Sequence, residues 1–105
     1  MNGYAFHPEA EADLNAIWDY IALDSPSAAD RMIEEIEDAI KRLVPFPHSG
    51  HRRPDLTSRP LRFANAGNYL IAYTPDKEPL WVVAVMHGRR SPRIMAAVLR
   101  GREQA

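Results

Sequence analysis

Trp81-Val82-Val83-Ala84-Val85-Met86 is the stretch that decides the fold, because six consecutive apolar residues, three of them valine, are typical of a strand covered on both faces. The run is far shorter than the roughly 18 apolar residues that a membrane-spanning helix needs. The stretch therefore predicts the central strand of a small sheet, and the rest of the chain has to cover that sheet.

Two more strands are expected just before this one. Leu61 and Phe63 alternate with Arg62, which predicts a strand with one apolar face and with Arg62 on the other face. The segment Tyr69–Tyr73 is rich in strand-forming residues, and turns are predicted on either side of it, at residues 65–68 and 75–79. Because the connections are short, we expect the three strands to form an antiparallel meander.

Two amphipathic helices are expected nearer the N-terminus, after a short candidate strand at Tyr4–Phe6. The first helix is predicted from Pro8 to Leu23. Ser25 and Pro26 form a cap-and-proline start signal for the second, which is predicted to end near Leu43. Apolar residues recur in both at three- and four-residue spacing, at Ala10, Leu14, Ile17, Trp18, Ile21, Ala29, Met32, Ile33, Ile36, Ile40 and Leu43.

A last short helix is predicted after Ser91-Pro92, which repeats the same start signal. We expect it to end at Gly101, a residue suited to the left-handed position that often closes a helix. Trp18 and Trp81 are both assigned to the core because of their size. The expected order is β-α-α-β-β-β-α, an α+β fold in which a helical hairpin packs on a small, mainly antiparallel sheet. The 105 residues suit a single domain, 1–105.

The net charge of −1 conceals an uneven distribution along the chain. Residues 1–47 carry three basic and ten acidic side chains, a net of −7, whereas residues 48–105 carry ten basic and four acidic ones, a net of +6. A basic half favours an acidic or phosphate-bearing partner. The alternative is that acidic helices and a basic sheet attract one another within the fold.

The chain contains no cysteine, which excludes a disulfide scaffold and thiolate metal sites and fits a reducing cytoplasm. His48 and His51 lie three residues apart in a loop, but Asp55 is the one carboxylate near them in sequence, so we expect no metal site. No glycine-rich phosphate loop occurs, and we expect no cofactor.

Several motifs, in order, resemble those of the ParE/RelE superfamily of toxins from type II toxin–antitoxin systems. Residues 6–14 are similar to its "P-E-A-x-x-D-L" opening, and residues 17–22 to its "I-x-x-Y-I" helix. Residues 46–52 resemble its "F-P-x-x-G-R" loop, and two strand motifs, "Y-x-I-x-Y" and "V-x-H-G-x-R", resemble residues 69–73 and 85–90. The resemblance covers residues 4 to about 95 and is closer to the ParE side of the superfamily.

This resemblance implies a plasmid-stabilisation type of toxin that is neutralised by a ParD-like antitoxin encoded beside it. ParE-like members are known for poisoning DNA gyrase by binding it. The resemblance implies contact with DNA only indirectly, through the antitoxin, in a hetero-oligomeric complex in the cytoplasm. Two alternatives stay open: a RelE-like endoribonuclease that cuts messenger RNA on the ribosome, and a module that binds the antitoxin but is no longer toxic.

The nuclease alternative needs a base, an acid and cationic groups that stabilise a pentacoordinate phosphate. Its candidates are Arg62, His87, Arg89 and Arg90, but residues 91–105 hold no Tyr or His of the kind that RelE-like enzymes carry near the C-terminus. His87 has a structural interpretation as a hydrogen-bonded residue at a strand end. One of Arg89 and Arg90 also has a structural interpretation, as the partner of an acidic helix residue. We therefore expect a protein that is not an enzyme.

The resemblance also implies a surface for the antitoxin, whose tail folds as it docks and places a helix in a groove and an extended chain beside the sheet. Antitoxin tails are commonly acidic, which suits the basic half of this chain. We expect contacts on the outer sides of the two long helices and on the basic sheet, at Ile17, Tyr20, Ile21, Ile33, Arg59, Arg62 and Arg89.

Overall fold

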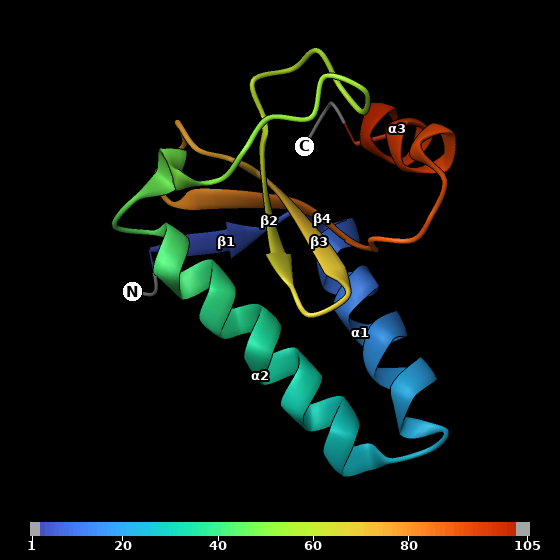
Figure 1. The fold of residues 1–105 in the computed structure, drawn as a ribbon. Helices are drawn as coiled ribbons and strands as arrows, with labels where there is room; N and C mark the ends of the chain where they lie inside the picture. The colour runs from blue at the N-terminus through green and yellow to red at the C-terminus, as the bar shows by residue number, and fades with distance from the viewer. Residues whose placement is uncertain (1–2, 103–105) are drawn as a thin grey trace.

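A computed structural model describes residues 3–102, and its element order confirms the predicted one. The α+β fold contains a helical hairpin, a mixed sheet and a C-terminal helix (Figure 1). The elements are β1 (Tyr4–Phe6), α1 (Pro8–Ala22), α2 (Pro26–Leu43), the short 3-10 helix η1 (Pro47–Ser49), β2 (Arg62–Ala66), β3 (Tyr69–Thr74), β4 (Leu80–His87) and α3 (Pro92–Arg100).

The stretch 81–86 lies inside β4, which is an interior strand of the four-stranded sheet, as predicted. The order across the sheet is β1-β4-β3-β2. β4 pairs antiparallel with β3 and parallel with β1, so the sheet is mainly antiparallel. The β3–β4 register shifts beside Tyr73, because Ala72 is opposite Ala84 whereas Tyr73 is opposite Val82, which leaves Val83 as the extra residue of a bulge.

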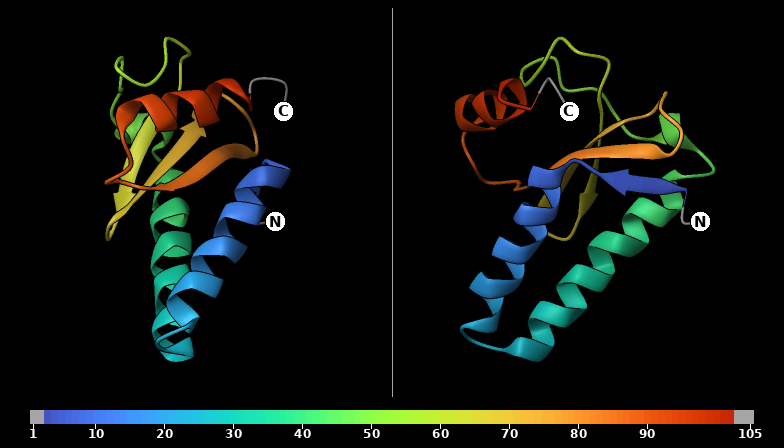
Figure 2. Two further views of the ribbon diagram at one scale, coloured as in Figure 1. Left: turned by 90° about the vertical axis from the view of Figure 1, so that its right-hand side faces the viewer. Right: turned by 180° about the vertical axis from the view of Figure 1, so that it is seen from behind.

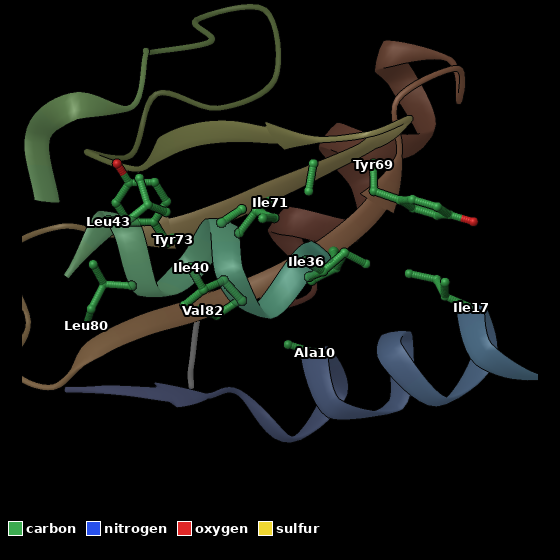
Figure 3. Packing of buried hydrophobic residues seen from close by; sticks show 13 residues of the cluster. Ala10, Ile17, Ile36, Ile40, Leu43, Tyr69, Ile71, Tyr73, Leu80 and Val82 are labelled. Atoms are coloured by element: carbon green, nitrogen blue, oxygen red, sulfur yellow. The ribbon is translucent and has the colours of Figure 1, made fainter. Parts of the chain in front are cut away.

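The sheet has a separate apolar cluster on each face. The helical hairpin covers one face with a cluster that includes Ile36, Ile40 and Val82 (Figure 3). α3 covers the opposite face with Met95 and Leu99, and Figures 1 and 2 show it across the sheet from the hairpin. Because helices cover both faces of the sheet, β4 is apolar almost throughout. Its alternating side chains enter the cluster on one face or the other.

Each α-helix begins at a side-chain cap followed by proline. The Ser25 hydroxyl accepts a hydrogen bond from the backbone N–H of Ala28 at 3.2 Å, and the Ser91 hydroxyl caps α3 in the same way. His7 caps α1 through Nδ1, which accepts from the N–H of Glu9 at 3.0 Å. These caps fix the entry of each helix and so the position of its apolar stripe.

Three local predictions are wrong. Trp18 is 36% exposed, because its indole N–H donates to Asp30 at 2.8 Å on the outside of the hairpin, and Trp81 is only half-buried. β2 runs on to Ala66, into the segment predicted as a turn, because its pairing with β3 continues to Tyr69. Gly101 has φ −68° rather than a left-handed conformation.

Within residues 3–102, no helix has both the length and the apolar composition that crossing a bilayer requires.

Candidate functional site

The candidate site begins where β4 extends beyond its parallel neighbour. β1 pairs with β4 only from Leu80 to Val82, and the last bond from that side runs from the N–H of His7 to the Val82 carbonyl. The outer edge of β4 continues for five more residues without a neighbouring strand. Backbone groups along such an edge need other partners.

Asp13 and Arg102 supply those partners. The Asp13 carboxylate accepts from the N–H of Val85 at 3.0 Å, and the Arg102 guanidinium donates to the Val83 carbonyl at 3.1 Å. The two side chains also bind each other through two hydrogen bonds of 2.6 and 2.9 Å, and both are largely buried. The hydrogen bonds that Arg102 donates to Asp13 hold the pKa of Arg102 above its usual value. A bidentate pair thus takes the place of a strand.

This pair was not predicted from the sequence, although one signal for it exists. Asp13 lies three residues after Ala10 and four before Ile17, and both of these are buried. That spacing places Asp13 on the apolar face of α1, where a carboxylate needs a partner. The partner, Arg102, lies 89 residues further along the chain, and the sequence holds no signal that selects it.

A groove of about 380 Å³ lies along the same edge of β4, between the strand and α1. We call it the α1 groove. Its lining is apolar and aromatic apart from Asp13, His87 and Arg90, which can carry charge, and its other members are Ala16, Ile17, Tyr20, Tyr69 and Val85. Figure 3 shows Ile17 and Tyr69 at the same end of the core.

Aromatic packing shapes one end of the α1 groove. The ring of Tyr69 meets that of His87 edge-on, with centroids 5.2 Å apart. Burial raises the pKa of Tyr69, and the nearby Tyr20 adds to this rise. Nδ1 of His87 accepts a hydrogen bond from the N–H of Arg89 at 3.1 Å, so a neutral His87 carries its proton on Nε2. Tyr20 itself is 75% exposed beside these residues.

A second groove, of about 310 Å³, lies on the other side of α1, and we call it the hairpin groove. Its apolar lining comes from Phe6, Leu14, Trp18 and Ile33, and its acidic members are Glu11 and Glu37. α1 therefore separates two grooves of different charge. The α1 groove has Arg90, His87 and Asp13, whose carboxylate binds Arg102, whereas the hairpin groove has two glutamates.

The structure does not bring the candidate nuclease residues together. Arg62 is opposite Tyr73 on β3, whereas His87 is opposite Tyr69, four residues further along. The two residues thus lie about 13 Å apart along the strands and two strand spacings apart across them. The Arg62 guanidinium instead donates to the Gly50 carbonyl at 3.2 Å. Only His87, Arg89 and Arg90 share one end of the sheet.

The predicted antitoxin contacts are spread over several surfaces. Ile17 and Tyr20 lie in the α1 groove and Ile33 in the hairpin groove. Ile17 is a core residue, and Ile21 and Ile33 are half-buried against the same cluster, so Tyr20 is the most exposed apolar member of the set. The arginines of the set occupy different environments: Arg59 donates to the Leu99 carbonyl, Arg62 contacts Gly50, and Arg89 is exposed.

The structural interpretation of Arg89 or Arg90 as the partner of an acidic helix residue is wrong. Both are exposed, and no acidic side chain within residues 3–102 forms an ion pair with either. The arginine that binds an acidic residue of α1 is Arg102. Elsewhere, His48 lies 3.0 Å from Asp76 on the surface and His51 pairs through its backbone with Phe63.

Known toxins are similar to this chain along most of its length. The profile of the family described as "ParE toxin of type II toxin-antitoxin system, parDE" matches residues 4–92. Among curated proteins, "Toxin ParE2" from two strains of Mycobacterium tuberculosis, CDC 1551 / Oshkosh and ATCC 25618 / H37Rv, is 29% identical over 105 aligned positions. The alignment covers 91% of this chain and 90% of the relative.

These matches identify the class of protein as the toxin component of a type II toxin–antitoxin system. The family within that class also follows from the match. Because the matched region spans well over half of the chain, the chain belongs to the ParE toxin family. Membership of this family implies an antitoxin partner in a toxin–antitoxin complex.

Proposed function

We propose that this chain inhibits growth by binding DNA gyrase, without catalysing a reaction, and that a ParD-like antitoxin neutralises it. Family membership supports the choice of both partners. The separation of Arg62 from His87 along the sheet supports action by binding, since acid–base cleavage of RNA needs its groups within hydrogen-bond reach of one phosphate. An inhibitor that acts by binding has no such requirement.

We assign the antitoxin to the α1 groove. Exposed Tyr20 and the apolar floor at Ile17 supply the aromatic and aliphatic contacts that anchor protein partners. Arg90 on the rim, with exposed Arg89 beside it in sequence, offers charge to an acidic segment. An acidic, apolar antitoxin tail is the partner that this combination suits.

The assignment is tested by replacing the exposed aromatic residue of the groove. We expect Tyr20→Ala to weaken antitoxin binding by about 2 kcal/mol, roughly 30-fold in Kd, because a tyrosine at the centre of an interface carries a large share of its energy. Leu23→Ala is the matched control, since Leu23 is 84% exposed at the end of the same helix but does not line the groove. Calorimetric titration with the antitoxin encoded beside the gene measures both variants. An equal loss of antitoxin affinity in the two variants would show that the antitoxin does not bind in the α1 groove.

The choice between gyrase binding and RNA cleavage is tested separately. We expect the immobilised full chain to retain purified gyrase, and we expect primer extension on messenger RNA after induction to show no new 5′ ends. New ends that disappear in a His87→Ala variant would establish the nuclease alternative instead. Tight antitoxin binding without either activity would identify a module that is no longer toxic.

A further inference from the structure

The loop between η1 and β2 runs beside α3 and leaves two shallow hollows of about 330 and 230 Å³ on the surface. The hollows adjoin, because Asp55, Ala96 and Arg100 line both of them. Arg59 belongs to the first hollow and Arg93 to the second. We call this surface the arginine trough. The loop and α3 that line it lie on the side of the sheet away from the helical hairpin (Figure 2).

The trough carries positive charge that its own surroundings leave uncompensated. Arg53 binds Asp55 through two hydrogen bonds of 2.9 and 2.8 Å, which hold the pKa of Asp55 below its ordinary value. No acidic side chain within the described range 3–102 forms an ion pair with Arg59, Arg93 or Arg100. Counting these four arginines against one carboxylate leaves a local charge of +3.

The spacing of the polar groups suits an extended polyanion. Arg93 and Arg100 are seven residues apart on α3, which places them on one face about 10.5 Å apart along the helix axis. Ala96 lies between them, so no bulky side chain separates the two arginines on this surface. The Thr57 hydroxyl accepts from the N–H of Arg59 at 3.1 Å and keeps its own proton for donation. Arginine and hydroxyl donors are the usual contacts to phosphate.

We propose that the arginine trough binds the phosphodiester backbone of nucleic acid. An acidic protein partner fits less well, because none of the large exposed apolar residues lines either hollow, Ile94 of α3 included. The lining also holds no aromatic ring to stack on bases, so the contact does not depend on base sequence. Arg93 and Arg100 lie beyond residue 92, where the match to the family profile ends. This direct contact differs from contact made through an antitoxin, and it does not depend on gyrase being the target.

The test measures fluorescence anisotropy of the full chain with a labelled 20-base-pair DNA duplex and, separately, a labelled RNA hairpin of matched charge. We expect binding to at least one of them at 50 mM salt that weakens steeply towards 200 mM. Arg93→Ala/Arg100→Ala is expected to weaken binding on the order of tenfold and to flatten the salt slope by about 1.8, because each lost phosphate contact removes roughly 0.9. The two probes show whether DNA or RNA is preferred.

The matched control is Arg31→Ala/Arg42→Ala, which removes the same charge from exposed positions on α2. We expect its Kd to stay within about twofold of the original value and its salt slope to stay within about 0.5, since these arginines lie outside the trough. Three results would overturn the proposal: no binding of either probe at 50 mM salt, equal effects of the two double variants, or displacement by polyglutamate at equal charge concentration. The last would assign the trough to an acidic protein.

Discussion

The hydroxyl of Tyr73 joins the sheet to the loop that follows α2. It donates to the Pro47 carbonyl at 2.6 Å and accepts from the N–H of Gly50 at 3.0 Å. Position 50 requires glycine, because a Cβ there would collide with the Tyr73 hydroxyl and lie 2.8 Å from the Phe63 carbonyl. One buried side chain thus satisfies two backbone groups of a segment with little secondary structure of its own.

We expect Tyr73→Phe to lower the free energy of unfolding by about 1–3 kcal/mol at pH 7, because two buried backbone groups lose their partner. Tyr4→Phe is the control, since no described residue forms a hydrogen bond with the Tyr4 hydroxyl, and its effect should stay within about 0.5 kcal/mol. Urea denaturation of both variants measures the difference. A Tyr73→Phe protein as stable as the original would show that the loop is held by other contacts.

The same tyrosine predicts a dependence on pH. Burial raises the pKa of Tyr73, so the folded protein keeps the phenol proton at pH values where the unfolded chain releases it. This contribution to stability is therefore fully present below the unfolded pKa of about 10 and declines as the pH rises above it. We expect the stability gap between the original protein and Tyr73→Phe to narrow above pH 10. A gap that widens there would contradict the sign of the shift.

At the scale of secondary-structure elements, the Asp13–Arg102 pair fixes the end of α3 against α1 and the free edge of β4. α1, which is far from the other two elements in sequence, meets β4 and the end of α3 at this one contact. Removal of Arg102 would leave the Asp13 carboxylate largely buried with only the N–H of Val85 as its partner, which is costly.

We expect Arg102→Ala to destabilise the fold by about 2 kcal/mol and to speed hydrogen exchange in α3 and at Val85. Arg100→Ala is the control, because Arg100 is exposed two residues away and should change stability by less than about 0.5 kcal/mol. In the double variant with Asp13→Asn the two losses should not add, since they remove the same interaction. Additive losses would mean that the two side chains act independently.

Local sequence signals predicted the positions of the helices and strands well. They failed for features that depend on contacts between residues far apart in sequence. Pro8, Pro26 and Pro92 with their caps located the helix starts, and the 81–86 stretch located β4, because these signals are local. The bulge at Val83 and the extension of β2 to Ala66 depend on pairing between strands, which composition does not encode. The exposure of Trp18 follows from its bond to Asp30 in another helix.

The candidate site could be predicted only in part. Ile17 and Tyr20 are expected as antitoxin contacts from the family resemblance, and both line the α1 groove. Arg62 and His87 are both predicted on strands, as a cation and a titratable group of one nuclease site, but the register places them at opposite ends of the sheet. The arginine trough was not predicted at all, since it needs a loop and α3 to be side by side.

At the scale of the whole molecule, the acidic and basic halves of the chain form different surfaces. The acidic residues belong largely to α1 and α2, which contribute the hairpin groove, whereas the basic residues gather on the loop, the sheet ends and α3. Of the three close contacts between basic and acidic side chains in the described part of the chain, only Asp13–Arg102 joins the two halves. Most of the charge on the two halves is thus not neutralised within the fold and remains available to bind partners.

The most direct test of the account is a supercoiling assay with purified gyrase, relaxed plasmid and increasing amounts of the full chain. If the chain is a toxin that acts by binding gyrase, supercoiling should fall as the chain is added and return when an equimolar amount of the neighbouring antitoxin follows. Undiminished supercoiling at a tenfold or greater molar excess of folded chain would contradict it.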